Sequence, residues 1–461
     1  LAVHLSIGQV YAFSVFRTPL VDRFGTGEFP IAVIFSIAIV LLGLSAAFGG
    51  TWMERNGPRK AMFLAACCFS SGFLVGALGI STGQLWLVYL GYGVLGGIGL
   101  GMGYISPVST LIKWFPDRPG LATGLAIMGF GGGALIASPL SNRLLGVFGG
   151  TDLAAGLVPT WIILGVGYFA FMMFGVFTVR LPPPDWRPAG YDPAARKQRS
   201  MQTASHVSAA GALRTPQFWL LWIVLFTNVT AGIGILEQAS PMVQDFFPGV
   251  TPATAAGFVG LLSIGNMAGR VCWSSTSDYL GRKPTYMLYL GGGAVLFFLV
   301  TTAGSAALPF FVVLTFLIIS FYGGGFATVP AYLKDLFGTY QVGAIHGRLL
   351  TAWSAAGVAG PTIVTLLTES QRRAGLEGPS AYRLSLLVMV GLLAVGFTAN
   401  FLIRPVDVRH HVQAETVPAA YPEEGGGREE TAGRTAQPAP GLGAPGSVHY
   451  AETNTAERSR R

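Results

Sequence analysis

Long stretches without any charged residue recur along this chain as far as residue 403, and they limit what it can fold into. They cover residues 1–16, 29–53, 61–112, 119–142, 153–179, 215–236, 246–269, 284–333, 349–368 and 384–403. A helix needs about 20 apolar residues to cross the hydrocarbon core of a bilayer, so 61–112 and 284–333 must each hold two helices. The sequence therefore predicts an all-α membrane protein with twelve transmembrane helices, six in each half.

Composition and charge agree with this prediction. Charged residues make up 11% of the chain, whereas a soluble domain carries about 25%. Loops on the side of the central linker carry 15 Lys and Arg residues and loops on the other side carry six. The positive-inside rule then predicts a multi-pass protein of the plasma membrane with the linker and both termini in the cytoplasm. The same rule accounts for the net charge of +8, and no basic patch indicates a nucleic-acid partner.

The two halves carry matching residues at a nearly constant separation. The matching pairs lie 224, 223 and 222 positions apart and are Glu54 with Asp278, Pro107 with Pro330, and Pro139 with Pro361. Because each half holds six helices and both halves start on the same side, this pattern indicates parallel repeats about an axis along the membrane normal.

The same pattern predicts four parts. Residues 1–180 form an N-terminal six-helix bundle, and residues 216–404 form a C-terminal one. Residues 181–215 are rich in Pro, Arg and Lys, which is typical of a linker. Residues 405–461 change to Pro, Gly, Glu, Thr and Ala; such a segment buries no core, so we predict a disordered cytoplasmic tail.

Arg270 stands out among the predicted helices. The stretch before it is uncharged from Phe246, and Asp278, eight residues later, lies at the predicted membrane surface. Arg270 is therefore roughly 12 Å inside that surface. Placing an arginine there costs on the order of 2.5–3.5 kcal/mol, so the side chain normally faces a cavity or a partner. With no carboxylate nearby in its own helix, Arg270 indicates an anion site.

A duplicated loop motif lies at the end of the second helix of each half. The pattern G-x-x-x-[DE]-[RK]-x-G-x-[RK]-[RK] is complete in the first copy and shortened in the second, where Ser274 replaces the first glycine. Its acid caps a helix end and its bases lie at the membrane surface, so it can act as a conformational latch between the halves; a simple positive-inside turn is the alternative. The latch residues are Gly50, Glu54, Arg55, Gly57, Arg59, Lys60, Asp278, Gly281, Arg282 and Lys283. These residues resemble the major facilitator superfamily over 1–404.

Three segments resemble a narrower group, the oxalate/formate antiporter family and the related monocarboxylate transporters. They are Tyr11-Ala-Phe-Ser-Val-Phe, Lys113-Trp-Phe-Pro-Asp-Arg with Gly120-Leu-Ala-Thr-Gly, and Thr215-Pro-Gln-Phe-Trp. The resemblance implies a secondary active transporter that moves small carboxylates by alternating access, and it places the anion on an arginine in the eighth helix. Asn266 and Arg270 match that element and share a helix face.

Two departures from the family pattern bear on the substrate. Trp353 occupies the position of a lysine that joins the arginine in the oxalate exchanger, and one cation balances a monoanion better than a dianion. We therefore expect a monocarboxylate such as lactate, pyruvate or formate. Oxalate/formate exchange stays open, since a cation could come from a residue that the alignment misses. Asn266 replaces an aspartate of the proton-linked relatives and does not titrate, which argues against proton symport through that position.

The resemblance also implies an aromatic enclosure around the anion. Aromatic walls exclude water and strengthen an Arg–carboxylate interaction. Taken singly, each of these side chains is more often a core or lipid-facing residue than a ligand-binding one. The substrate-binding set that the resemblance implies, besides Arg270 and Asn266, is Tyr11, Tyr104, Phe130, Tyr322, Phe326 and Trp353.

Other polar residues receive no role in this interpretation. Lys113, Lys334, His346 and Arg348 are assigned to cytoplasmic loops, and His4 to the first helix. A carboxylate sensor that signals through the tail is a second hypothesis, and a membrane enzyme a third, which lacks an acid dyad or Cys/His pair within the membrane. We expect no enzyme activity, metal or cofactor, and a chain that functions as a monomer in the lipid bilayer.

Overall fold

The computed structural model describes residues 1–183, 186–190, 203 and 205–412. All of them belong to one compact unit, residues 1–425. The predictions for the middle of the linker and for the tail beyond residue 412 lie outside the described residues. Residues 405–412 are described, and they include a short 3-10 helix, η5 (Val408–His410), and an isolated bridge between Val207 and His411.

The first half of the chain crosses the molecule six times. The first crossing is broken into α1, a 3-10 segment η1 and α2, and the fourth contains a π-helical segment, η2. The elements are α1 (Ala2–Ile7), η1 (Gly8–Ala12), α2 (Ser14–Phe24), α3 (Glu28–Asn56), α4 (Pro58–Thr82), α5 (Leu85–Val88), η2 (Tyr89–Gly96), α6 (Gly97–Trp114), α7 (Pro119–Gly149) and α8 (Leu157–Thr178).

The second half repeats this plan after a short linker helix, α9 (Ala209–Ala212). Its ninth crossing contains a further π-helical segment, η3, and its eleventh crossing is divided at Leu350. The elements are α10 (Pro216–Phe246), α11 (Pro252–Leu280), α12 (Arg282–Met287), η3 (Leu288–Gly292), α13 (Gly293–Ala303), η4 (Gly304–Ala306), α14 (Leu308–Phe337), α15 (Val342–Leu349), α16 (Thr351–Arg373) and α17 (Pro379–Leu402).

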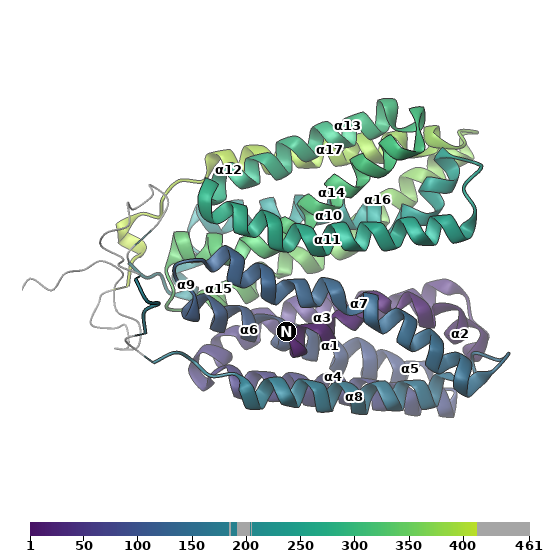
Figure 1. Cartoon of the computed structure of the whole chain (residues 1–461), viewed down its shortest axis with the longest axis horizontal. Coiled ribbons are helices and arrows are strands. Elements are labelled where there is room, and N and C mark those ends of the chain that lie inside the picture. The colour runs from purple at the N-terminus through teal and green to yellow at the C-terminus, as the bar shows by residue number, and fades with distance from the viewer. Residues whose placement is uncertain (184–185, 191–202, 204, 413–461) are drawn as a thin grey trace, which may run out of the picture. The chain divides into compact units, whose positions relative to one another are not determined.

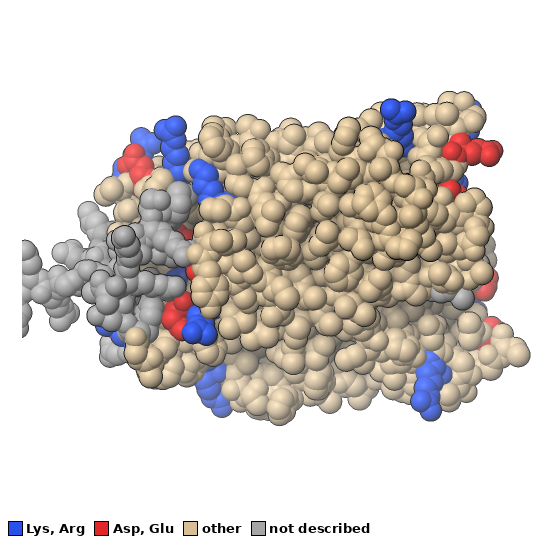
Figure 2. Space-filling model, turned by 45° about the horizontal axis from the view of Figure 1, so that its top comes forward, with Lys and Arg blue, Asp and Glu red and all other residues tan. Residues whose placement is uncertain are grey.

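The prediction of an all-helical protein with twelve crossings is confirmed. Among the described residues, ten helices are long and apolar enough to span a bilayer. The other two crossings are the broken first one and α11, which carries Arg270. Figure 2 shows a broad band without Lys, Arg, Asp or Glu between the two charged ends of the face in view, as a surface in contact with lipid requires.

The helices of each half lie together (Figure 1). α1 to α8 form one group, and α10 to α14 with α16 and α17 form the other. α15 is an exception, because it packs mainly on α3 of the first half. The linker residues 205–215 lie at the end of the molecule that carries α9, on the left of Figure 1, and we call this end the linker side.

Several helices begin at a proline that follows the loop directly. Proline is suited to the first helical position, since its fixed φ fits a helix and its missing N–H is not needed there. α10 begins at Pro216, directly after Thr215, whose hydroxyl accepts a hydrogen bond from the Phe218 N–H. The helices that start in this way include α4 at Pro58, α7 at Pro119 and α11 at Pro252.

The first crossing differs from its prediction. The uncharged stretch ends at Phe16, but the helix continues through Arg17 and Arg23 to Phe24. Arg23 stays inside the helix because its guanidinium donates hydrogen bonds to the carbonyls of Ile80 (2.9 Å) and Ser81 (3.1 Å), near the C-terminal end of α4. A cation at a helix C-terminus satisfies carbonyls that have no partner within the helix.

Glycines let the backbones of neighbouring helices touch. A Cβ atom on Gly99 of α6 would lie 2.6 Å from the Phe69 nitrogen of α4, and backbone cannot give way locally. We expect Gly99→Ala to lower the melting temperature of the purified protein, with an overpacking cost of about 1–3 kcal/mol. Gly146→Ala in α7 is the matched control, since no atom lies within 4 Å of its added Cβ. Equal melting temperatures for the two variants would contradict this account.

Candidate functional site

Arg270 is buried in the centre of the molecule without a negative partner. Its side chain is only 1% exposed. Nε donates to Oδ1 of Asn266 (3.1 Å), one helical turn earlier, and Nη1 donates to the carbonyl of Ile127 in α7 (2.9 Å). Nη2 is buried and has no hydrogen-bond partner among the described residues. A guanidinium offers five N–H donors, so this group keeps unused donor capacity and an uncompensated charge.

Further donors in the same region also lack acceptors. The hydroxyls of Tyr11, Tyr104 and Tyr322 and the indole Nε1 of Trp353 are buried without a hydrogen-bond partner in the described part of the chain. Tyr11 and Tyr322 interact electrostatically with each other and with Arg270. Buried polar groups are normally hydrogen-bonded, so a cluster of unpartnered donors around a cation indicates a site for an anion.

The structure brings together all six aromatic residues that the resemblance implies. Arg270 Cζ lies 5.9 Å from the centre of the Phe130 ring and 5.6 Å from the centre of the Phe326 ring. Neighbouring rings are in edge-to-face contact, with centroids 4.6 to 5.4 Å apart. The contacts join Tyr11 with Phe130, Tyr104 with Phe130 and Trp353, Trp353 with Phe130 and Phe326, and Phe326 with Tyr322.

Small residues on α7 allow Arg270 to reach across from α11. A Cβ on Gly131 would lie 3.2 Å from Arg270 Nε, and a Cβ on Gly124 would lie 2.6 Å from the Arg270 carbonyl. The glycine-rich face of α7 therefore brings the two halves close together at Arg270. On the other side of α7, a Cβ on Gly133 would lie 2.5 Å from the carbonyl of Leu5, which presses α1 against the same helix.

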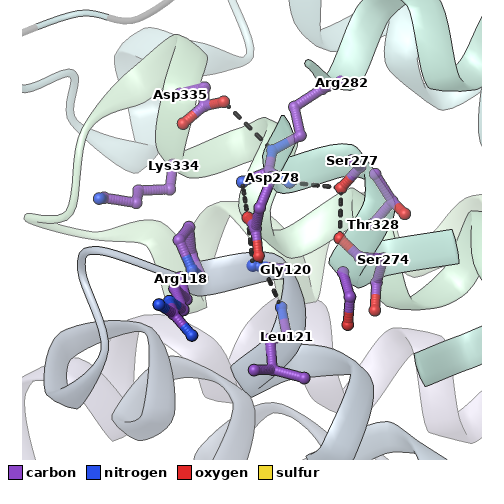
Figure 3. Close-up of polar contacts among 12 residues, drawn as sticks. Arg118, Gly120, Leu121, Ser274, Ser277, Asp278, Arg282, Thr328, Lys334 and Asp335 are labelled. Atoms are coloured by element: carbon purple, nitrogen blue, oxygen red, sulfur yellow. Dashed lines mark hydrogen bonds and ion pairs between the residues drawn. The ribbon is translucent and has the colours of Figure 1, made fainter. Parts of the chain in front are cut away.

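The acid of the second loop motif caps a helix of the opposite half (Figure 3). Asp278, at the end of α11, accepts hydrogen bonds from the backbone N–H groups of Gly120 (3.0 Å) and Leu121 (2.9 Å), which open α7. Its Oδ1 also pairs with Arg282 Nη2 at 2.6 Å. Arg282 Nε in turn pairs with Asp335 of α14 at 3.2 Å. This buried arginine is fully paired, in contrast to Arg270.

The acid of the first motif does the same in the other direction. Glu54, near the end of α3, accepts a hydrogen bond from the N–H of Gly343 (3.0 Å), in the first turn of α15. Within its own half it pairs with Lys113 of α6 (2.8 Å) and accepts from the hydroxyl of Ser109 (3.0 Å). A Cβ on Gly50 would lie 2.8 Å from the Ala344 Cα, so α3 and α15 touch at this glycine. The two acids thus make reciprocal caps between the halves.

The remaining motif residues shape the two turns and anchor them within each half. Gly57 and Gly281 adopt φ values of +87° and +94°, a region that favours glycine. Arg59 donates to the carbonyl of Val176 (3.1 Å), and Lys283 donates to carbonyls at the end of α17. Arg55 and Lys60 are exposed at the linker side.

Several further hydrogen bonds join the two groups of helices. Besides the two caps, Thr123 donates to the carbonyl of Ala327 (2.7 Å) and Lys334 donates to the carbonyl of Pro116 (3.0 Å). Ser354 donates to the carbonyl of Ile39 (2.9 Å). The structure is therefore closed towards the linker.

Several residues that the sequence interpretation set aside have defined partners. Assigning Lys113, Lys334, His346 and Arg348 to loops is wrong, because they lie in α6, α14 and α15. Lys113 is the partner of Glu54, and Lys334 bridges the halves. Each directly follows a long uncharged stretch, 61–112 for Lys113 and 284–333 for Lys334. A basic residue at the end of such a stretch fits a loop as well as the last turn of a helix. Among the described residues, no group of three or more His, Cys, Asp or Glu is placed to hold a metal ion.

His4 was also set aside, but it lies fully buried beside Tyr104. Both of its ring nitrogens lie within hydrogen-bonding distance of backbone carbonyls. One signal was available in the sequence, since His4 precedes Tyr11 by seven residues and two helical turns put both on one face.

Comparisons with known proteins agree with this geometry. The family model described as Major Facilitator Superfamily matches residues 1–361 and 242–438. The chain is 27% identical to the oxalate:formate antiporter of Oxalobacter formigenes, over 77% of this chain and 79% of that protein. It is 25% identical to apicoplast pyruvate carrier 1 of Toxoplasma gondii, over 76% of this chain and 71% of that protein. The solved structure of the E. coli fucose:proton symporter shares the fold, with a TM-score of 0.63 and 14% identity over 87% of this chain and 97% of that chain. The chain therefore belongs to the major facilitator superfamily.

Proposed function

We propose that this protein is a secondary active transporter of small carboxylates, with Arg270 as the group that binds the anion. The observation that carries the proposal is the buried guanidinium with an unpartnered Nη2, beside three tyrosine hydroxyls and an indole N–H that also lack acceptors. A carboxylate offers two acceptor oxygens and one negative charge, so it would satisfy several of these donors and balance Arg270. A neutral sugar would leave the charge uncompensated.

The single cation favours a monocarboxylate of the size of formate, pyruvate or lactate. Trp353 closes the site next to Phe326 with its ring at 4.6 Å and adds an N–H donor but no charge. The similarity to a pyruvate carrier supports this substrate class. Exchange of oxalate for formate is the alternative, and the similarity to an oxalate:formate antiporter supports it.

Transport would proceed by alternating access between residues 1–180 and 216–404, with the linker side in the cytoplasm. The contacts that close the linker side are helix caps and single hydrogen bonds between rigid helices, which can break together when the halves rock. Residues 50–60 and 278–283 would act as the latch of this state. Arg270 itself donates to the carbonyl of Ile127 across the halves, so opening the linker side would uncover it.

The first test is binding of lactate, pyruvate, formate and oxalate to the purified protein, read as a thermal shift. A ligand that binds the folded state raises the melting temperature, and the rise grows with the logarithm of the ligand concentration relative to the dissociation constant. We expect at least one of the four to raise it. The absence of any shift, together with no uptake of the labelled compounds into proteoliposomes under any imposed gradient, would refute the proposal.

The charge argument also predicts the effect of a second cation. We expect Trp353→Lys to increase affinity for oxalate about tenfold relative to formate, because the added ammonium balances the second negative charge. The ratio of the two dissociation constants is the measurement, since it cancels any general loss of folded protein. Trp353→Met is the control for loss of the ring, and it should leave the ratio near its original value. An unchanged ratio in Trp353→Lys would show that residue 353 does not face the anion.

A further inference from the structure

His4 occupies an unusual position for a buried histidine. It lies in α1 with no exposed surface. Nδ1 is 2.6 Å from the carbonyl oxygen of Ala126 in α7, and Nε2 is 3.0 Å from the carbonyl oxygen of Tyr104 in α6. Both ring nitrogens therefore face acceptors that have no proton to give.

A neutral imidazole cannot satisfy this arrangement. It carries one N–H, so one nitrogen would place its lone pair against a carbonyl lone pair at hydrogen-bonding distance. The imidazolium ion carries two N–H groups and donates to both carbonyls. A proton from solution that adds to the free nitrogen thus converts a repulsive contact into a charge-assisted hydrogen bond. Of the ordinary side chains, only histidine does this near neutral pH.

The same turn of α7 connects His4 to Arg270. Ala126 accepts from His4, and the next residue, Ile127, accepts from Arg270 Nη1. The imidazole also lies against the Tyr104 ring (5.3 Å between centroids), which touches Phe130 and Trp353 of the aromatic enclosure. His4 and Arg270 interact electrostatically. His4 is therefore one aromatic layer away from the anion site.

The groups that face His4 are cationic or neutral. They are Arg270 of α11, Tyr104 of α6 and His346 of α15. Among the described residues no carboxylate forms an ion pair with His4. The helices that pack against α1, which are α4, α6, α7 and α8, contain no Asp or Glu. The positive charge of Arg270 therefore disfavours protonation of His4 until an anion binds between the two residues.

We propose that His4 is a proton-binding site that supplies the second positive charge of the anion site. This inference rests on the proposed function, since the negative charge is the carboxylate on Arg270. The anion and the proton then stabilise each other's binding, and thermodynamic linkage makes the effect reciprocal. Protonated His4 with Arg270 balances a dianion such as oxalate, or lets a monocarboxylate bind together with one proton. The second positive charge that a dianion needs thus comes from His4 in the first helix. Trp353, which carries no charge, does not provide it.

The sign of the pH dependence follows directly. Bound anion favours the imidazolium, so anion affinity rises as the pH is lowered from about 8 to about 5.5. Carboxylates stay ionised across that range. We expect affinity for formate to rise about tenfold over this interval and affinity for oxalate about 100-fold, since a dianion interacts with the added charge twice as strongly.

The decisive experiment counts protons during binding. Isothermal titration calorimetry with oxalate and with formate, in two buffers of different ionisation enthalpy at about pH 7, gives the number of protons taken up per bound anion. We expect uptake of up to one proton with wild-type protein and none with His4→Gln. His346→Gln is the matched control: this second buried histidine also lies against Tyr104 (5.8 Å), but its Nδ1 has no partner among the described residues, and uptake should persist.

The outcomes separate the two proposals. Anion binding that depends on Arg270 but takes up no proton, or takes up the same number in His4→Gln, overturns the role of His4 and leaves the carboxylate site in place. No anion binding at any pH removes both. If His4→Gln fails to fold, titration of 15N-labelled histidine in the wild-type protein replaces it. One imidazole should then gain a proton when oxalate is added, and its resonance should be absent from the spectrum of His4→Asn.

Discussion

Arg270→Gln should abolish carboxylate binding and at the same time make the empty protein more stable. Loss of the charge removes the interaction that holds the anion, and truncating one member of a buried charge pair costs about 2–5 kcal/mol of binding free energy. We therefore expect affinity to fall by about 100-fold or more. Without ligand, the wild-type arginine is buried without an anion, so the neutral glutamine relieves a desolvated charge. A melting temperature at or above the wild-type value is expected.

Two controls separate the charge from its geometry and from general effects. Arg270→Lys keeps the charge but loses the planar fork, so binding should be weakened and not abolished. Arg143→Gln removes an exposed arginine from α7 and should change neither affinity nor stability. A lower melting temperature in Arg270→Gln, with carboxylate binding intact, would show that the arginine is a structural cation that Ile127 and Asn266 already satisfy.

The position of Arg270 explains why the sequence alone could single it out as the centre of a candidate site. A single cation in an apolar helix indicates a functional residue, because burying its charge costs free energy that a partner or a cavity must offset. The aromatic residues carry no such signal individually, since rings are common throughout the chain. Tyr11, Tyr104 and Phe130 lie in three different helices, and only a family resemblance could place them together. The structure shows that they do lie together, in contact around the guanidinium.

The polar contacts that depend on tertiary structure could not be predicted in the same way. Lys113 and Asp335 lie near helix ends, where charged residues are common and usually solvated. Their pairing with Glu54 and Arg282 follows from how α6 and α14 pack, and sequence spacing does not report this. His4 gives no hydrophobic or charge pattern, and its two acceptors are backbone carbonyls, which every residue has.

In the proposed mechanism, the anion site and the latch act on the same equilibrium. Arg270 donates across the halves to Ile127, and Asp278 lies two helical turns further along α11 and caps the start of α7. A carboxylate that draws Arg270 away from Ile127 would remove one of the contacts that close the linker side. Binding would then lower the cost of opening, which is the coupling that alternating access requires.

Asp278→Asn should shift the protein away from the state that is closed at the linker side. The carboxylate caps α7 with two hydrogen bonds and pairs with Arg282, and all of these groups are buried. Asparagine keeps one acceptor but loses the charge at the helix N-terminus, while Arg282 keeps Asp335. Because breaking a buried pair costs about 3–5 kcal/mol and one partner remains, we expect a shift of about 2 kcal/mol, or roughly 30-fold in the population ratio.

The separation of the halves can be measured as the distance between spin labels at residues 56 and 280, after the native cysteines are replaced by serine. Asn56 and Leu280 are exposed at the linker-side ends of α3 and α11. The Asp278→Asn variant should show a longer second distance that wild type populates weakly, and Glu54→Gln should show the same change, because its carboxylate makes the reciprocal cap. Glu369→Gln breaks only the exposed pair with Arg373 and should leave the distances unchanged. If the Asp278→Asn distances match wild type while transport is lost, the carboxylate acts in some step other than closure, and the helix caps are not the latch.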